Sequence, residues 1–283
     1  MANLFRSLVF VPGNNPRFLE KAKSISADIV CFDLEDSVPE KEKTKARKLI
    51  KSALKQRKHY SANIYARTNS PESGKIESDL KEIMQKGIDG IVIPKVNSAK
   101  ELKKIEKTII SLEKKGKISG TRIIPSIESA LGVVNCYEIA SCSKRIDALV
   151  FGIFDLLNDI GIEYTKGNPR GAKYARYKIP VDVTAAGVYA IDGIWQDIKD
   201  KSGLKKDCDV GRSLGYVGKS IIHPDQIETV HKIYHPNKNE IRWAKLVMKT
   251  YNSSTKKGKG ATVVDGKMID EVHYKRAKAL LEI

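Results

Sequence analysis

Acidic side chains and one arginine stand at the ends of short apolar runs that we expect to be β-strands. The second run ends in Asp33-Leu34-Glu35-Asp36, the third in Arg67 and the fifth in Glu128, and Asp155 follows the sixth. Two carboxylates from neighbouring strands, completed by water and a bidentate substrate, make an oxygen-rich site that suits Mg²⁺ and would suit Mn²⁺ nearly as well. Glu128 and Asp155 are therefore the candidate metal ligands.

Each of these acids also has a structural interpretation. A carboxylate at a strand end often caps the next helix or pairs with a lysine. Arg67 could be the ion-pair partner of Asp36, but a guanidinium beside a metal is also well shaped to bind a substrate carboxylate. Because these groups recur at successive strand ends, we favour the functional interpretation.

Other catalytic chemistries find less support. The five histidines lack the i, i+4 pairing of a zinc-binding helix, and the chain has neither a G-x-S-x-G elbow nor a Walker phosphate loop. Only Lys95 and Lys219 occupy strand-end positions that a Schiff base would need, and we interpret both as ion-pair partners of the acid cluster. His223 is interpreted as a hydrogen-bonded strand-end histidine rather than a base.

Eight short β-branched runs alternate with amphipathic, charge-rich stretches, as in parallel strands that crossover helices bury on both faces. The stretch Lys41 to Lys55 has one apolar stripe at helical spacing, and Pro224 opens a helix over Asp225 to Tyr234. No G-x-G-x-x-G follows the first run, so we predict a closed (β/α)8 barrel rather than an open doubly wound sheet. The predicted strands are Leu8 to Val11, Ile29 to Leu34, Asn63 to Ala66, Gly90 to Ile93, Arg122 to Ile127, Ala148 to Phe151, Val188 to Ile191 and Lys219 to Ile222.

Two domains are expected: a catalytic barrel over residues 1–235 and a small helical module over 236–283. The module should contain a helix from Lys238 to about Tyr251 and another over Asp270 to Ile283. Between them, Asn252 to Gly260 is rich in Ser, Thr, Lys and Gly, which is typical of a mobile linker.

The bulk composition narrows the class of protein without deciding its function. The 51 Lys and Arg against 34 Asp and Glu give 283 residues a net charge of +17, which would attract acidic metabolites or polyanions or simply aid solubility. The four cysteines of the chain show no C-x-x-C spacing. The N-terminus does not have the pattern of a signal peptide, and no apolar run reaches the roughly 20 residues of a membrane helix. We therefore expect a cytoplasmic protein with reduced thiols and no structural zinc site.

An ordered series of motifs extends over nearly the whole chain, and it resembles the citrate lyase beta subunit family. This is the citryl-CoA, malyl-CoA and citramalyl-CoA lyase group of magnesium-dependent barrels, related to the HpcH/HpaI aldolases. The motifs are Arg6 to Gly13 (RSLVFVPG), Phe32 to Val38 (FDLEDSV), Ile124 to Ser129 (IPSIES), Phe151 to Leu156 (FGIFDL), Ala190 to Gly193 (AIDG), Gly218 to Pro224 (GKSIIHP) and Asp265 to Asp270 (DGKMID).

The resemblance implies a role for each candidate residue. Glu128 and Asp155 resemble the metal ligands, with Glu128 also touching substrate, and Arg67 resembles the arginine that binds the oxo acid. Glu35 and Asp36 resemble the acids that hold the metal-bound waters and this arginine.

Two further implications concern the coenzyme and the assembly. Asp270 resembles an acid or base that relatives place over a neighbouring subunit's barrel, which implies a homotrimer or hexamer. The loop near Ser253 to Gly260 is richer in lysine than is usual for the group and bears on how Asp270 is presented. The residues expected near the coenzyme A phosphates are Arg6, Pro12, Gly13, Lys43 and Arg47.

The implied activity is cleavage or formation of a β-hydroxyacyl-CoA, such as malyl-, citramalyl- or citryl-CoA, into acetyl-CoA and a 2-oxo acid. Alternatives are a class II aldolase that acts on free hydroxy acids without coenzyme A, and an accessory subunit that acts on a carrier-bound thioester. A polyanion or nucleic-acid binder lacks support because the sequence has no aromatic stacking platform and no known module for RNA or DNA.

Overall fold

Eight segments rich in Val, Ile and Ala form the strands of a closed parallel barrel in a computed structural model that describes residues 5–164 and 170–281. Each strand pairs with the next along the chain, and β8 returns to pair with β1. Their bounds are β1 Ser7–Pro12, β2 Ile29–Asp33, β3 Asn63–Arg67, β4 Gly90–Ile93, β5 Arg122–Ile127, β6 Ala148–Phe151, β7 Tyr189–Asp192 and β8 Gly218–Ile221. The predicted (β/α)8 fold is confirmed.

The strand register brings the predicted site residues to one end of the barrel. Pro12 pairs with Asp33, and Asp33 pairs with Arg67, each at the last position of its strand. Ile127 pairs with Phe151, so the residues that follow β5 and β6 continue side by side. The carboxyl ends of these strands therefore share one mouth, where barrel enzymes carry their active sites.

Apolar side chains fill the interior of the barrel. Leu8, Ile29, Val92, Ile124 and Ile191 belong to one buried cluster, contributed by five different strands. These runs have few polar positions because the barrel core buries one side of each strand and the helices bury the other.

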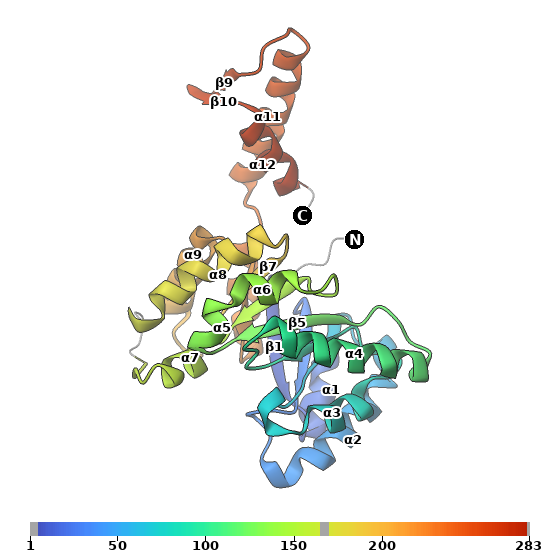
Figure 1. The fold of residues 1–283 in the computed structure, drawn as a ribbon. Helices are drawn as coiled ribbons and strands as arrows, with labels where there is room; N and C mark the ends of the chain where they lie inside the picture. The colour runs from blue at the N-terminus through green and yellow to red at the C-terminus, as the bar shows by residue number, and fades with distance from the viewer. Residues whose placement is uncertain (1–4, 165–169, 282–283) are drawn as a thin grey trace. The chain divides into compact units, whose positions relative to one another are not determined.

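Helices surround the strands, as Figure 1 shows. Helix α2 begins at Lys43 and buries Ala46, Ile50, Ala53 and Leu54, which follow the apolar stripe seen in the sequence. The other barrel helices are α1 Pro16–Lys21, α3 Ile76–Ile83, α4 Ala99–Gly116, α5 Ala130–Val134, α6 Cys136–Ser141, α7 Ile153–Asp159, α8 Lys173–Ala185, α9 Lys201–Leu214 and α10 Ile227–Tyr234.

Single-turn 3-10 helices occur beside several of these helices. They are η1 Ala22–Ser24, η2 Glu40–Glu42, η3 Arg57–His59, η4 Pro71–Ser73, η5 Arg170–Ala172 and η6 Pro224–Gln226. Among the described residues, no helix has the length and the apolar character needed to cross a bilayer.

The chain divides into two compact units, one over Phe5–His231 and one that begins at Lys232. The second unit contains α11 Lys238–Thr255, an antiparallel hairpin of β9 Thr262–Val264 and β10 Lys267–Ile269, and α12 Glu271–Leu281. Its own small core includes Ala244, Val247, Val264, Ile269 and Ala277.

The hairpin is a feature that the sequence analysis missed. Asp265 and Gly266 both have positive φ, 47° and 74°, as the tightest hairpin turns require. An Asp-Gly pair after three β-branched residues was the signal that could have revealed it. The expected linker from Asn252 is also shorter than predicted, since α11 continues to Thr255.

Candidate active site

Arg67, the last residue of β3, is held by a buried carboxylate that the sequence analysis did not assign. Its Nε and Nη2 donate to the two oxygens of Asp33 at 2.7 and 2.8 Å. Ser37 and the backbone N–H of Glu35 also donate to Asp33. Arg67 packs over the ring of Phe10, with 4.5 Å from its Cζ to the ring centroid. The two hydrogen bonds to Asp33 fix the plane of the guanidinium. Asp36, the partner considered from the sequence, lies farther away, with its Oδ2 at 3.9 Å from Arg67 Nη1.

Glu35 joins Arg67 to a second cation. Its Oε2 lies 3.0 Å from Arg67 Nη1, and its Oε1 lies 3.0 Å from Lys95 Nζ. The loop that carries Glu35 is fixed by Lys43, whose ammonium donates to the carbonyls of Leu34 and Glu35 at 2.9 and 3.0 Å. Glu35 is therefore buried, oriented and charge-paired on both oxygens.

Lys95 follows β4 and reaches three carboxylates. Besides Glu35, its Nζ lies 3.2 Å from Asp155 Oδ1 and 3.5 Å from Asp36 Oδ1. The interpretation of Lys95 as a partner of the acid cluster is confirmed. Lys219 instead pairs with Asp192 and Asp207 in a separate buried network, so its expected contact with the same cluster is wrong.

Glu128 extends from the end of β5 into the space beside these groups. It is 5% exposed, and its Oε2 is buried without a hydrogen-bond partner among the described residues. Gly152, at the end of β6, leaves room for it: a Cβ there would stand 2.3 Å from Glu128 Cγ. The glycine in the Phe151-Gly152 motif is therefore explained by the space that the carboxylate needs.

Burial and charge separate the acids by their pKa. Burial raises the pKa of Glu35 to about 7, even though Arg67 and Lys95 act against it. Burial and then the nearby Glu35 raise the pKa of Glu128 to about 8. Asp33 is buried too, but the charge and hydrogen bonds of Arg67 outweigh that burial and lower its pKa to about 2. Asp33 is a permanent counter-ion, whereas burial disfavours the charged forms of Glu35 and Glu128.

A cavity of about 490 Å³ opens above these residues at the carboxyl ends of the strands. Its acidic and basic wall includes Asp33, Asp36, Arg67, Glu128 and Asp155. The apolar wall includes Phe10, Pro12, Val150, Phe154 and Ile222. Its size and mixed lining fit a small-molecule site.

The donor set fits a hard divalent cation. The buried, unpartnered Oε2 of Glu128 and the carboxylate of Asp155 offer the oxygen ligands that Mg²⁺ prefers. No cluster of three or more His, Cys, Asp or Glu suited to a metal is present in the part of the chain that the structure describes. A magnesium ion here would therefore complete its shell with water and substrate oxygens, as this ion commonly does.

The residues predicted to bind coenzyme A are divided between two ends of the barrel. Pro12 lines the cavity, and Gly13 closes against β2 with its N–H on Asp33 O at 2.9 Å. Arg6 precedes β1 and forms a two-point ion pair with Asp28, which precedes β2. A strand of six residues spans roughly 20 Å, so Arg6 lies at the opposite end from the acid cluster. Arg6 is therefore not at the mouth, and its expected place near the coenzyme A phosphates stays a prediction.

Lys43 and Arg47 already have partners within the barrel. Lys43 is 9% exposed and binds the two carbonyls described above. Arg47 Nε donates to Asp79 at 2.7 Å, and Asp79 in turn accepts from the backbone and side chain of Asn69. Both residues support the loops after β2 and β3, and their role toward coenzyme A stays a prediction.

Asp270 belongs to the second unit, where it caps helix α12. Its Oδ1 accepts from the backbone N–H of Val272 at 3.0 Å and lies 2.7 Å from His273 Nδ1. The hydrogen bond from His273 lowers the pKa of Asp270. All of these contacts involve Oδ1, so Oδ2 of Asp270 has no hydrogen-bond partner among the described residues and is left for chemistry.

Comparison with known proteins adds a finding that the geometry alone does not supply. The sequence profile of the HpcH/HpaI aldolase/citrate lyase family matches residues 6–224. The chain belongs to this family. The match includes the end of every barrel strand and every cavity residue named above, so the acid cluster is part of the shared core.

Relatives that match nearly the whole chain include proteins with two kinds of name. The citrate lyase subunit beta of Leuconostoc mesenteroides subsp. cremoris is 36% identical over 99% of this chain and 93% of its own length. A (3S)-malyl-CoA thioesterase of Cereibacter sphaeroides is 32% identical over 99% of this chain and 94% of its own. A solved structure of the M. tuberculosis citrate lyase beta subunit, complexed with oxaloacetate and magnesium, is 25% identical, with a TM-score of 0.70 over 82% of this chain and 98% of that one.

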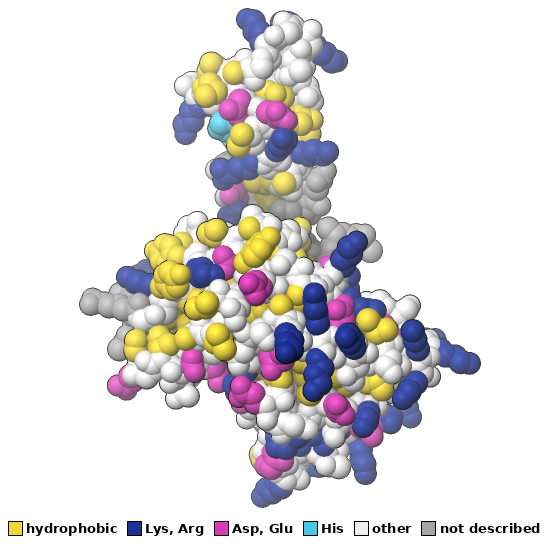
Figure 2. All heavy atoms as spheres, viewed as in Figure 1, with side chains coloured by type: hydrophobic (Ala, Val, Ile, Leu, Met, Phe, Trp, Pro, Cys, Tyr) yellow, Lys and Arg dark blue, Asp and Glu magenta, His cyan; other side chains and the backbone are white. Residues whose placement is uncertain are grey.

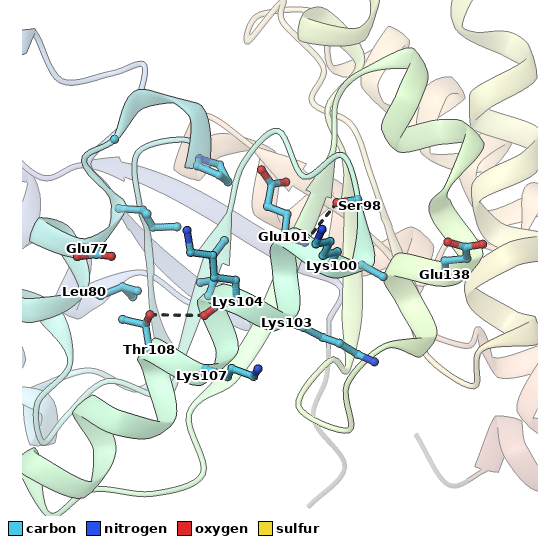
Figure 3. A pocket seen from close by; sticks show the side chains of 15 residues that line it. Glu77, Leu80, Ser98, Lys100, Glu101, Lys103, Lys104, Lys107, Thr108 and Glu138 are labelled. Carbon is cyan, nitrogen blue, oxygen red and sulfur yellow. Dashed lines mark hydrogen bonds between the residues drawn. The ribbon is translucent and has the colours of Figure 1, made fainter.

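A larger hollow of about 1060 Å³ lies on the outer surface, between α3 and α4, and carries no comparable chemistry. Figure 3 shows its wall, where Lys100, Lys103, Lys104 and Lys107 follow one another along α4. Thr108 and Ser98 bond only to the backbone of that same helix. Since this hollow lacks a converging pair of buried acids, the smaller cavity at the strand ends is the better candidate active site.

Sequence reasoning missed the roles of two residues of the site, Asp33 and Gly152. Asp33 is recognisable from the sequence as the buried end of β2. The sequence does not show which acid between Asp33 and Asp36 faces Arg67, because that depends on the register of β2 and β3. Gly152 acts through space rather than through a polar group. Lys95 was noted, although its contact with Asp155 crosses the barrel mouth. His223 caps the turn after β8 through the N–H of Asp225, in line with its structural interpretation.

Proposed function

We propose that the protein is a Mg²⁺-dependent carbon–carbon lyase that cleaves or forms a β-hydroxyacyl-CoA. The observation that carries this proposal is the pairing of an oriented guanidinium with a buried, unpartnered carboxylate oxygen across one cavity, Arg67 facing Glu128. The family membership and the relatives' names support the same reaction class.

Arg67 would bind the carboxylate of the 2-oxo acid. Asp33 accepts from Nε and from one N–H of Nη2, and Oε2 of Glu35 forms an ion pair with Nη1. A guanidinium has five N–H donors, so one on Nη1 and one on Nη2 remain for a substrate carboxylate. Because Asp33 keeps its charge at any physiological pH, Arg67 stays in the orientation that this contact needs.

Glu128 and Asp155 would hold the magnesium ion. When bound, Mg²⁺ would lower the pKa of the substrate's β-hydroxyl and neutralise charge on the oxo acid. In the cleavage direction a base takes the hydroxyl proton, the Cα–Cβ bond breaks, and its electron pair passes to the thioester as an enolate. The enolate carbon then takes a proton from an acid, for which Asp270 is our candidate.

The acyl arm of the coenzyme has a suitable slot beside the cavity. A pocket of about 180 Å³ shares Phe10, Pro12 and Ile222 with the acidic cavity and continues to Phe18 and Lys21 of α1. An apolar slot with a lysine at its wall matches a pantetheine chain that leads to phosphates. We propose this route in place of one through Arg6.

The test is to incubate the protein with malyl-CoA, citramalyl-CoA and citryl-CoA, with Mg²⁺ or with EDTA, and to measure 2-oxo acid and acetyl-CoA. Metal-dependent release of both products is expected from at least one thioester, and Glu128→Gln should abolish it. If no thioester yields a 2-oxo acid with metal present, the lyase proposal fails.

Two further measurements separate the alternatives. Free malate, citramalate and citrate, tested in parallel, would be cleaved by an aldolase that does not need coenzyme A. Thiol release in excess of acetyl-CoA would reveal thioester hydrolysis, the activity in the name of the Cereibacter sphaeroides relative. Both outcomes would move the protein to a different reaction within the same family.

A further inference from the structure

Lys95 has a backbone conformation that its local structure does not explain. Among the described residues, three other than glycine have positive φ: Lys95 at 53°, Lys117 at 51° and Asp265 at 47°. Lys117 ends helix α4 and Asp265 lies in the hairpin turn, and both places favour the left-handed conformation. Lys95 comes two residues after β4 and ends no helix. Such a conformation has a cost for a side chain with a Cβ, and it often marks a functional position.

The side chain of Lys95 contacts three carboxylates at the barrel mouth. Lys95 Nζ lies within 3.5 Å of carboxylates from the segment after β2 and from α7, which are Glu35, Asp36 and Asp155. These acids lie 60, 59 and 60 positions away in the chain, so nothing local dictates the contact. The ammonium therefore stands among the acids as a cation supplied by the protein itself.

Charge at the mouth is unbalanced despite this lysine. Asp33, Glu35, Asp36, Glu128 and Asp155 are five potential negative charges, and they face the two positive charges of Arg67 and Lys95. Arg67 is committed to Asp33 and Glu35. Lys95 is the cation that directly contacts Asp155, one of the two carboxylates that we propose for the metal.

We propose that Lys95 is a positioning residue that competes with the divalent cation for Asp155 and so limits how tightly the metal binds. The proposal rests on the metal site of the proposed function. With metal bound, Asp155 exchanges the ammonium for the ion, and Lys95 keeps Glu35 and Asp36 in place. A divalent ion and an ammonium repel at such short range, so removal of the lysine charge favours the ion.

The consequence is opposite to that of an ordinary supporting residue. Loss of a residue that merely supports metal ligands weakens metal binding. Loss of the Lys95 charge should instead raise the affinity for Mn²⁺ by about tenfold or more, since the two cations are separated by little more than one carboxylate group.

The experiment measures Mn²⁺ binding to the whole protein without substrate, by electron paramagnetic resonance of free Mn²⁺ or by calorimetry. Lys95→Met keeps the length and removes the charge. Lys95→Asn also removes the charge, and asparagine tolerates the left-handed backbone, so it preserves the fold if methionine does not. Lys95→Arg keeps the charge, and Lys100→Met makes the same change of net charge on the exposed start of α4.

Tighter Mn²⁺ binding by the methionine and asparagine variants, with near wild-type affinity in the arginine and Lys100→Met variants, is the expected result. Equal or weaker Mn²⁺ binding in both uncharged variants overturns the proposal. The proposal also fails if Glu128→Gln leaves Mn²⁺ binding unchanged, because the ion would then not bind at this site. The outcome is independent of lyase activity. If the affinities shift as expected but no thioester is cleaved, the proposed reaction fails while the role of Lys95 stands.

Discussion

At the scale of single residues, the site depends on a division of labour among carboxyl groups of the same type. Asp33 is surrounded by donors and stays ionised, so it can orient Arg67. Glu128 has the same chemistry but a buried oxygen without a donor, so it gains most from a cation. Environment rather than residue type therefore separates the structural acid from the candidate ligand.

The ion pair of Asp33 and Arg67 should contribute strongly to stability. Asp33→Asn leaves a buried guanidinium without its main counter-ion, so we expect the free energy of unfolding at pH 7 to fall by about 3–5 kcal/mol. Denaturant unfolding followed by circular dichroism measures this. Ser78→Ala on the surface of α3 is a control that should change little. A loss below about 1 kcal/mol in Asp33→Asn would contradict the assignment.

The ion pair of Asp33 and Arg67 also predicts how the stability difference between wild type and Asp33→Asn depends on pH. The pKa of Asp33 is about 2 in the folded chain against an ordinary value of 3.8. A lowered folded pKa gives stability that is present above pH 4 and is lost as the pH falls toward 2. Between pH 6 and pH 3 the difference between wild type and Asp33→Asn should therefore narrow, by about 1 kcal/mol. If the stability difference between the two proteins instead widens from pH 6 to pH 3, the pKa of Asp33 is not lowered in the folded chain.

Gly152 should be essential for the metal although it binds nothing. A Cβ at this position overlaps Glu128, and the φ of −95° means that alanine adds no backbone strain. Gly152→Ala should therefore displace the carboxylate and weaken Mn²⁺ binding by about 10–100-fold, the range for lost support of a ligand. Gly260→Ala is the matched control, since a Cβ there meets nothing within 4 Å. Unchanged Mn²⁺ affinity in Gly152→Ala would mean that Glu128 is not a ligand.

At the scale of elements, the sequence predicted the barrel well because burial on both faces leaves a clear signal. All eight strands lie within two residues of their expected ends, since β-branched runs and charge-rich helices alternate regularly. The hairpin of the second unit was missed because its strands have three residues each, too few for a periodic pattern.

The site was predictable as far as the strand-end rule extends. That rule placed Glu35, Arg67 and Glu128 at one mouth, and the structure brings them together. Arg6 and Pro12 belong to one motif, but strand β1 separates them and Pro12 is the one that lines the cavity at the mouth. The backbone of Lys95 and the choice of Asp33 for Arg67 depend on tertiary packing, which one sequence does not encode locally.

Helix α2 gives a test of whether Lys43 serves the fold or the coenzyme. Lys43→Met removes the donor to two carbonyls of the loop that carries Glu35, so we expect a loss of about 1–3 kcal/mol in unfolding free energy. Lys45→Met, on the exposed face of the same helix, is the control. If Lys43 instead bound coenzyme A phosphate, its loss would raise the thioester KM and leave the stability unchanged.

At the scale of the whole molecule, the outer surface is uneven in a way that supports self-association. Figure 2 shows basic side chains over α4 and apolar side chains over α5 and α8. The exposed apolar side chains on α5 and α8, each half or more exposed, are Leu131, Val134, Tyr174, Tyr177 and Val181, and Tyr137 of the neighbouring α6 is also half exposed. Contiguous apolar surface of this kind is typical of protein interfaces. It supports our expectation of a homo-oligomer, in which the second unit of one chain could serve another.

That arrangement predicts complementation between two inactive variants. Asp270→Asn removes the carboxylate but keeps a good helix cap, so its melting temperature should stay near that of the wild type, whereas Asp270→Ala should lose both the cap and activity. Glu128→Gln should be inactive through its barrel. Mixed oligomers of Asp270→Asn and Glu128→Gln would contain sites with an intact barrel from one chain and an intact Asp270 from another.

The measurement is lyase activity after the two variants are unfolded together and refolded as a mixture, compared with each refolded alone. Recovery of activity only in the mixture is expected if Asp270 acts on a neighbouring barrel. If Asp270 acts within its own chain, every site in the mixture lacks one group, and activity stays at the level of the separate variants. An active Asp270→Asn protein would instead remove this residue from the reaction and direct the search for the acid to the cavity itself.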